Sequence, residues 1–85
     1  MHVLIIGAAG MVGRKLAERL ANDGAIGDTG IETLTLYDVI EPRAPASATF
    51  KVERATGDLP AAGEAARLIA SRPDVIFHLA AVVSG

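Results

Sequence analysis

Three glycines near the start of the chain are spaced so that they can hold a diphosphate group. Gly7, Gly10 and Gly13 follow the apolar run Val3–Ile6, and a helical pattern begins at Met11. Glycine has no Cβ, so the first can turn the backbone sharply out of a strand, and the second leaves the main chain open to a pyrophosphate. The third lets the new helix pack closely, and the unpaired N–H groups of its first turn attract anions. We therefore predict a nucleotide-binding turn, for which a plain strand-to-helix turn is the alternative.

The context of these glycines matters more than their number. Their spacing is Gly-x-x-Gly-x-x-Gly, one residue longer at the front than the Gly-x-Gly-x-x-Gly form, and a glycine triplet alone is a weak signal. An apolar strand before it and an amphipathic helix after it make the prediction stronger. The residues of this turn that we expect to contact a dinucleotide are Gly7, Ala9, Gly10, Met11, Val12 and Gly13.

An aspartate closes the second predicted strand. Asp38 follows the segment Glu32–Tyr37, at the end of the sheet where ligands of such folds bind. A carboxylate there can accept both hydroxyls of an adenosine ribose and repels a 2′-phosphate, which favours NAD over NADP. Arg43 and Arg54 weaken that exclusion, because an arginine can hold the phosphate. The alternative for Asp38 is a solvated strand-end acid or an Asx turn.

Two further groups of residues follow strands at the same edge. Asp58, with Leu59 after it, can bond the adenine amino group, or it can cap a helix that starts at Pro60; both remain open. The small residues after the last strand offer backbone beside the second ribose and the nicotinamide; they are Leu79, Ala80, Ala81 and Val82. His78 lies within that apolar strand, where a packed, hydrogen-bonded imidazole is favoured over a catalytic one.

The elements that position these residues alternate between strand and helix. From Met11 an apolar stripe of small and aliphatic residues predicts a helix that ends at Gly24, and the segment 25–30 reads as a loop. The stripe consists of Val12, Leu16, Ala17, Leu20 and Ala21.

The second half of the chain gives the remaining elements. The strand 32–37 is followed by an irregular crossover over 39–48, where Pro42 and Pro45 exclude a regular helix, and by a short edge strand over 49–54. A helix over 61–71, with Ala65, Leu68 and Ile69 inward, and a buried strand over 74–79 complete the series. This order predicts an α/β fold, the N-terminal half of a doubly wound parallel sheet (Rossmann) with spatial strand order 3-2-1-4.

The length and composition limit the class of protein and the kinds of partner that the chain can have. The 85 residues suffice for one small domain, and a 51% hydrophobic content with net charge −2 gives no reason to expect nucleic acid or an anionic membrane as partner. Without cysteine there is no disulfide framework and no thiolate metal site, which fits a cytoplasmic protein. No apolar run reaches the roughly 18 residues of a membrane helix, and the first run reads as a strand rather than a signal peptide.

Taken together, these motifs match the motifs of a known protein family in order and spacing. The residues that carry the match are Gly7–Gly13, Asp38, Gly57–Leu59 and His78–Ala81. In this order the whole chain resembles the N-terminal part of an extended short-chain dehydrogenase/reductase of the NAD-dependent epimerase/dehydratase type. The resemblance implies that Asp38 binds the adenosine ribose and Asp58 the adenine, and that Ala80 and Ala81 line the cofactor, NAD. More narrowly, residues 24–30 and 78–85 resemble dehydrogenases of small sugar acids.

One motif of that family is absent. Its members transfer a proton with a Tyr-x-x-x-Lys pair, but Glu41 stands four residues after Tyr37, and neither Lys15 nor Lys51 has the required spacing. We therefore expect residues 1–85 to be the front of a longer, homo-oligomeric enzyme, with no catalytic residues of their own. The last strand would then have an uncovered edge, so the segment alone should aggregate or oligomerise.

Three functions fit these observations. The first is an NAD-dependent oxidoreductase that moves a hydride to or from a small sugar acid or polyol-like hydroxy acid. A nucleotide-sugar epimerase or dehydratase of the same family is the second. The third, of another class, is a non-catalytic dinucleotide-binding module that senses redox state; a downstream Tyr-x-x-x-Lys would speak for an enzyme and against such a sensor.

Overall fold

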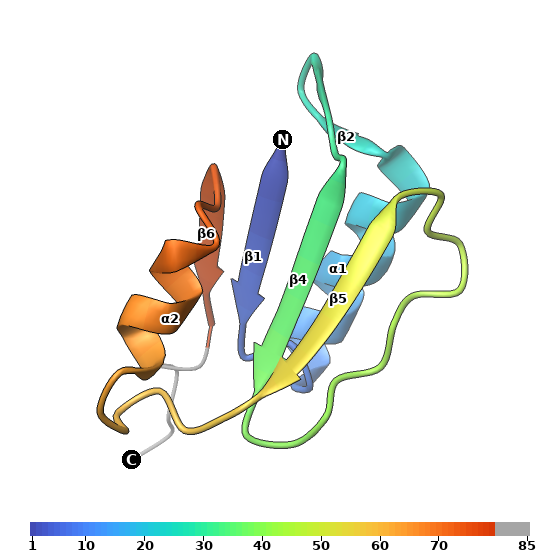
Figure 1. Cartoon of the computed structure of the whole chain (residues 1–85). Coiled ribbons are helices and arrows are strands. Elements are labelled where there is room, and N and C mark those ends of the chain that lie inside the picture. Colours follow the sequence, from blue (N-terminus) through green and yellow to red (C-terminus); the bar gives the residue numbers. More distant parts are fainter. Residues whose placement is uncertain (80–85) are drawn as a thin grey trace.

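Four parallel strands form the centre of the molecule. The computed structural model describes residues 1–79, and its main sheet contains β1 (His2–Ile6), β4 (Thr33–Asp38), β5 (Lys51–Thr56) and β6 (Val75–His78). Their spatial order is β5-β4-β1-β6, all neighbours being parallel (Figure 1). Numbered by the main strands alone, this is the predicted order 3-2-1-4, and the predicted Rossmann-like α/β fold is confirmed.

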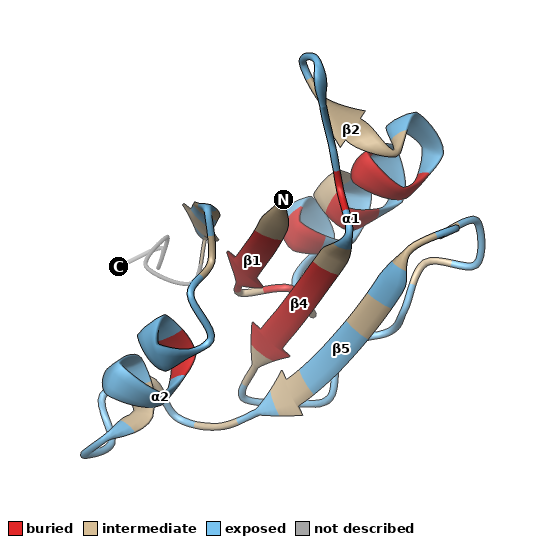
Figure 2. Ribbon diagram, turned by 45° about the horizontal axis from the view of Figure 1, so that its top comes forward, coloured by how far each residue is buried: buried red, intermediate tan, exposed pale blue. Residues whose placement is uncertain are grey.

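Side-chain alternation along the inner strands divides the core into two layers. On one face Val3 and Ile5 of β1 pack with Leu34 and Leu36 of β4, beneath the helix α1 (Met11–Asp23). The other face carries a smaller cluster of Leu4, Ile6 and Tyr37, which Leu68 of the helix α2 (Glu64–Ala70) covers. Figure 2 shows that burial is concentrated in β1, β4 and one side of α1, whereas α2 and β5 are mostly exposed.

The helix α1 follows its predicted stripe except at the first turn. Ala17, Leu20 and Ala21 are buried, and Gly24 ends the helix in the left-handed conformation (φ 69°), its N–H donating to the carbonyl of Leu20. Val12, predicted to face inward, is 66% exposed. It lies beyond the carboxyl end of β1, where no sheet remains for it to pack on.

The segment 25–30 is a hairpin and not the predicted loop. The short strands β2 (Ala25–Ile26) and β3 (Thr29–Gly30) pair antiparallel around Gly27, whose φ is 59°. A two-residue turn with glycine first and positive φ there is a regular hairpin connection. The sequence concealed it because the strands are only two residues long.

The third strand and the second helix both differ from the predicted bounds. The edge strand, expected over 49–54, extends from Lys51 to Thr56, where each residue pairs with one of β4. The helix, expected over 61–71, begins only at Glu64, because Gly63 before it has φ 84° and breaks the helical path. Of its expected inward residues only Leu68 is buried; Ala65 is exposed and Ile69 is 62% exposed.

The last strand is less buried than its sequence suggests. Burial along β6 alternates between intermediate and exposed residues, because within residues 1–79 it forms one edge of the sheet. Neither helix in this part of the chain combines the length and apolarity needed to cross a membrane.

Gly13 gives a direct test of the packing between α1 and the strand. A Cβ at this position would collide with the carbonyl oxygen of Gly7 and lie 2.8 Å from the Cα of Ala8, both fixed backbone atoms. We expect Gly13→Ala to lower the free energy of unfolding by about 1–3 kcal/mol, as overpacking does. Urea denaturation measures the change.

Gly30→Ala is the matched control. An added Cβ there meets nothing within 4 Å, and Gly30 does not have a positive φ, so the free energy of unfolding should stay within about 0.5 kcal/mol of the parent value. Equal effects of the two substitutions would contradict the close approach at Gly13.

Candidate functional site

The glycine turn is held against the end of β4 by its own backbone. Gly7 has φ 94°, a conformation that favours glycine, and its N–H donates to the carbonyl oxygen of Tyr37 at 2.9 Å. The next N–H, that of Ala8, donates to the same oxygen at 3.1 Å. These two bonds fix where the chain leaves the sheet and therefore where α1 begins.

The three positions Gly7, Gly10 and Gly13 differ in why they favour glycine. Gly7 has the left-handed backbone, and Gly13 has the close contact described above. Gly10 has neither, since its φ is −73° and an added Cβ would lie 3.5 Å from the carbonyl oxygen of Gly7, an ordinary contact. The fold itself thus tolerates a side chain at Gly10, and the space that glycine leaves there opens on the exterior, where a ligand can approach the backbone.

The start of α1 is suited to bind an anion. Gly10 is the N-cap, with no side-chain hydrogen bond, and the first turn contains no acidic residue. Within residues 1–79 the N–H groups of Met11, Val12 and Gly13 have no acceptor, whereas that of Arg14 donates to the carbonyl of Gly10. Unpaired N–H groups and the helix dipole together attract a phosphate.

A groove of about 250 Å³ runs along this helix start. Its lining residues are Gly7, Gly10, Met11, Val12, Gly13 and Leu79. Met11 and Val12 are exposed and therefore have no role in the core. Both side chains line the groove instead. Leu79 also lines the groove. The other residues expected beyond the last strand, Ala80, Ala81 and Val82, lie outside the described residues.

Asp38 links the glycine turn to the end of β4. Its Oδ2 accepts the N–H of Ala9 at 2.8 Å, and its Oδ1 accepts the N–H of Val39 at 2.7 Å. A carboxylate has about four lone-pair sites, so two remain for hydroxyl donors from a ligand. The bond to Val39 reaches the N–H of the next residue, whereas an Asx turn bonds the N–H two residues on, so this bond is not the predicted Asx turn. The other carboxylate oxygen is oriented toward the glycine turn.

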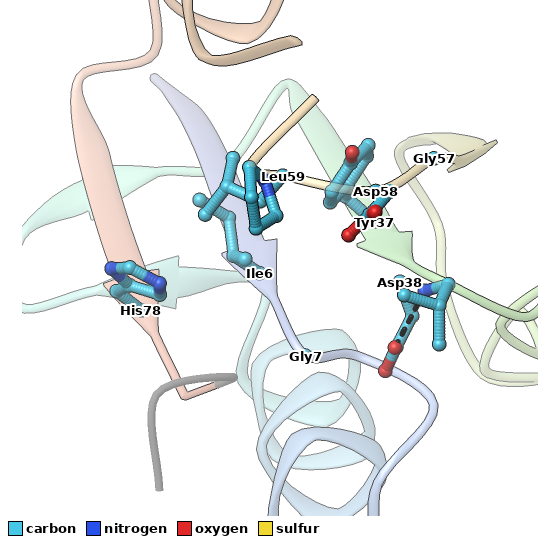
Figure 3. A pocket seen from close by; sticks show the side chains of 10 residues that line it. Ile6, Gly7, Tyr37, Asp38, Gly57, Asp58, Leu59 and His78 are labelled. Carbon is cyan, nitrogen blue, oxygen red and sulfur yellow. Dashed lines mark hydrogen bonds between the residues drawn. The ribbon is translucent and has the colours of Figure 1, made fainter. Parts of the chain in front are cut away.

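A second cavity, of about 290 Å³, lies on the other side of Gly7 (Figure 3). It is lined by Ile6, Gly7, Tyr37, Asp38, Val39, Gly57, Asp58, Leu59, Pro60 and His78. Gly7 lines both this cavity and the groove, so the two meet at the glycine turn. The structure thereby brings together the turn, the aspartate that ends β4 and the aspartate that follows β5.

The alternative capping role of Asp58 is wrong. The helix does not start at Pro60 but at Glu64, its N-cap is Gly63, and no side chain caps it. Asp58 instead accepts the N–H of Ala61 through its backbone carbonyl, at 2.8 Å, while its exposed side chain lines the cavity.

His78 is exposed rather than packed. The expectation of a buried imidazole with a hydrogen-bonded neighbour fails because β6 is a sheet edge, and no hydrogen bond to this ring occurs within the described part of the chain. The side chain lines the cavity of Asp38 and Asp58, and also an apolar groove of about 200 Å³ between α2 and the sheet.

Neither arginine named for a possible 2′-phosphate lines the cavity. Arg54 forms an ion pair with Glu41 at 3.3 Å. Arg43 lies with Arg14 and Glu18 in a separate depression beside α1. The carboxylates that line this cavity are those of Asp38 and Asp58.

A side-chain network behind the cavity escaped the sequence analysis. Tyr37, 1% exposed, donates its hydroxyl to Oε1 of Glu64 at 2.7 Å. Arg67 donates to both carboxylate oxygens of Glu64, at 3.0 and 3.1 Å, and its guanidinium lies 6.0 Å from the centre of the Tyr37 ring. The spacing of Glu64 and Arg67, three apart, was the available signal, but it did not reveal the tyrosine.

Burial and this network shift the ionisation of both partners. Burial, and then the hydrogen bond to Glu64, raise the pKa of Tyr37 to about 12. The bonds from Arg67 and then from Tyr37 lower the pKa of Glu64. At neutral pH the network is therefore a neutral phenol donating to a carboxylate.

With the geometry in place, comparison with known proteins decides the family. Residues 3–85 match the NAD dependent epimerase/dehydratase family. The chain belongs to that family. Its members include relatives with both dehydrogenase and epimerase names.

Three similar proteins illustrate this range. The chain is 40% identical over 89 residues to a D-erythronate dehydrogenase of Cupriavidus necator, and 37% identical over 84 residues to a UDP-glucose 4-epimerase of Mycolicibacterium smegmatis. These alignments cover 100% and 99% of this chain but 27% and 26% of the relatives. A crystal structure of a nucleoside-diphosphate-sugar epimerase from Agrobacterium tumefaciens superimposes with a TM-score of 0.94 at 58% identity, covering 100% of this chain and 25% of that one. The chain thus spans about a quarter of the length of these family members.

The ionisation of Tyr37 can be measured directly, because it is the one tyrosine of a chain without tryptophan. Absorbance at the tyrosinate band during an alkaline titration should give a midpoint near 12 instead of 10.0. Since the folded-state pKa is the higher one, this contribution to stability is complete below pH 10 and is lost as the pH rises toward 12.

The variant Glu64→Ala removes the acceptor and the nearby negative charge, so its midpoint should fall toward 10. Glu53→Ala, a change of the same type on an exposed strand position, should leave it unchanged. A parent midpoint at 10 in folded protein would contradict the burial and the hydrogen bond.

Proposed function

We propose that this chain is the dinucleotide-binding part of an NAD-dependent oxidoreductase that acts on a small sugar acid such as D-erythronate. The observation that carries the proposal is the pairing of an uncapped helix start, left open by Gly10, with the carboxylate of Asp38 at the neighbouring strand end. The identity of 40% to a D-erythronate dehydrogenase supports the substrate class.

In this proposal the two hollows on either side of Gly7 hold the two ends of one ligand. The N–H groups of Met11, Val12 and Gly13 bind the diphosphate, to which Gly10 gives access. The adenosine lies in the cavity of about 290 Å³, with its ribose hydroxyls on Asp38 and its base beside Asp58 and Leu59. Leu79, Ala80 and Ala81 are expected to line the nicotinamide half of the ligand.

The chemistry divides between the cofactor and the protein. Bound NAD accepts or returns a hydride, and the protein orients it and handles the accompanying proton. Tyr37 is unsuited to proton transfer, since its hydroxyl is committed to Glu64 and has a raised pKa. The chain's role is therefore binding and orientation of the cofactor, including exclusion of a phosphorylated ribose by the charge of Asp38.

A nucleotide-sugar epimerase is the second candidate. It is favoured by the 58% identity to a nucleoside-diphosphate-sugar epimerase and by the 37% identity to a UDP-glucose 4-epimerase. In that case the cofactor would be reduced and reoxidised within one turnover. Assays of the full-length protein separate the candidates, because a dehydrogenase releases NADH in step with the sugar acid consumed, whereas an epimerase interconverts two nucleotide sugars without net NADH.

Asp38→Asn tests the ribose role. The amide keeps one oxygen, which can accept the N–H of Ala9 but not also that of Val39, and it loses the charge. NAD binding should therefore weaken about 10-fold while NADP binding improves relative to it. Isothermal titration with both dinucleotides measures the ratio. Asp28→Asn, at the exposed hairpin tip, is the charge-matched control and should change neither affinity. An unchanged ratio for Asp38→Asn would remove the role assigned to this carboxylate.

Gly10→Val tests the access to the backbone. The added side chain enters open space, so the free energy of unfolding should fall by no more than about 1 kcal/mol, while binding of NAD should be lost. Thermal melts and titration of the same sample report the two quantities. Normal NAD affinity in folded Gly10→Val protein would place the diphosphate elsewhere.

A further inference from the structure

The wall of the larger cavity is built on an irregular segment. Between the end of β5 and the start of α2, residues 57–63 have few backbone bonds of their own; the N–H of Ala61 donates to the carbonyl of Asp58, and that of Glu64 to the carbonyl of Ala61. Asp58 and Leu59, on this segment, line the cavity. A recognition surface on a loop needs support from the scaffold to hold its geometry.

That support comes from two sides of Gly57. Its N–H donates to the carbonyl of Asp38 at 3.1 Å, which ties it to β4. On the other side, a Cβ at Gly57 would collide with Oε1 of Glu64 and lie 2.6 Å from the hydroxyl of Tyr37. The backbone of residue 57 therefore rests directly on the hydrogen bond between these two side chains.

The hydrogen bond itself is well shielded. Tyr37 is 1% exposed and the side chain of Glu64 is 19% exposed, while Arg67 covers the carboxylate from outside. Glu64 is also the first residue of α2, so the bond connects the buried strand β4 to the helix that ends the loop. Leu59 packs on the cluster that contains Tyr37 and Ile6, and Figure 3 shows it beside Ile6 at the cavity.

We propose that the network of Tyr37, Glu64 and Arg67 positions the Asp58–Leu59 wall and thereby sets a preference for adenine among the bases that the cavity can hold. The network acts through the backbone at Gly57 and not by touching the base with its polar atoms, since the Tyr37 hydroxyl and both Glu64 oxygens already have partners. The inference rests on the proposed function, in which Asp58 faces the adenine amino group.

The test compares NAD with nicotinamide hypoxanthine dinucleotide, which lacks that amino group. Isothermal titration of the full-length protein gives the ratio of the two dissociation constants for the parent, Tyr37→Phe, Glu64→Ala and Glu64→Gln. The parent should prefer NAD. Tyr37→Phe and Glu64→Ala should each reduce the preference about 3- to 10-fold, the scale of one hydrogen bond. Glu64→Gln, which keeps an acceptor for the tyrosine, should retain most of it.

Asp23→Asn removes an ion pair with Arg19 on the exposed side of α1, and it should leave the preference unchanged. If the network merely stabilised the fold, Tyr37→Phe and Glu64→Ala would weaken the binding of both dinucleotides by the same factor. That result would overturn the inference. The inference would also be rejected if folded Tyr37→Phe kept the parent ratio of dissociation constants. Equal affinity of the parent for both dinucleotides would reject the inference and leave the proposed function intact. Failure of the parent to bind either dinucleotide would reject the proposed function and the inference together.

Discussion

The carbonyl oxygen of Tyr37 accepts two consecutive backbone N–H groups, and the arrangement of the site depends on this contact. Gly7 and Ala8 reach it only because Gly7 adopts a backbone conformation that side chains disfavour. The register of the sheet places Ile6 opposite Tyr37, so the turn begins where the pairing of β1 and β4 ends. The position of the open helix start relative to Asp38 follows from that single junction.

Close packing then fixes the direction of the helix. At Gly13 the backbone of α1 approaches the turn more closely than any Cβ allows, which presses the helix start against the strand exit. Charge completes the junction, because the Asp38 carboxylate draws in the N–H of Ala9 from the same turn. Hydrogen bonding, steric fit and electrostatics thus act on one short segment, and the hollows on either side of Gly7 result from it.

The features that sequence could predict are those set by local chemistry. The apolar strands, the left-handed cap at Gly24 and the strand order follow from periodicity, glycine placement and the handedness of crossovers. The predicted start of α2 is wrong because Pro60 is as compatible with a turn as with a first helical residue, and the helix begins only after the left-handed Gly63. The network of Tyr37, Glu64 and Arg67 could not be found, since it joins residues far apart along the chain through a contact that only the tertiary structure creates. The predicted burial of His78 is wrong for a related reason, because its exposure depends on which strand occupies the sheet edge.

The double engagement of Asp38 has a consequence for anyone who wishes to redesign the site. This carboxylate also holds the turn in place by accepting the N–H of Ala9. Replacing it with arginine, so that a phosphorylated cofactor can bind, would therefore remove a structural hydrogen-bond acceptor as well as a negative charge. A successful redesign therefore has to supply a new partner for that amide in the same step. Cofactor choice and loop shape are coupled here at one residue, and neither can be retuned alone.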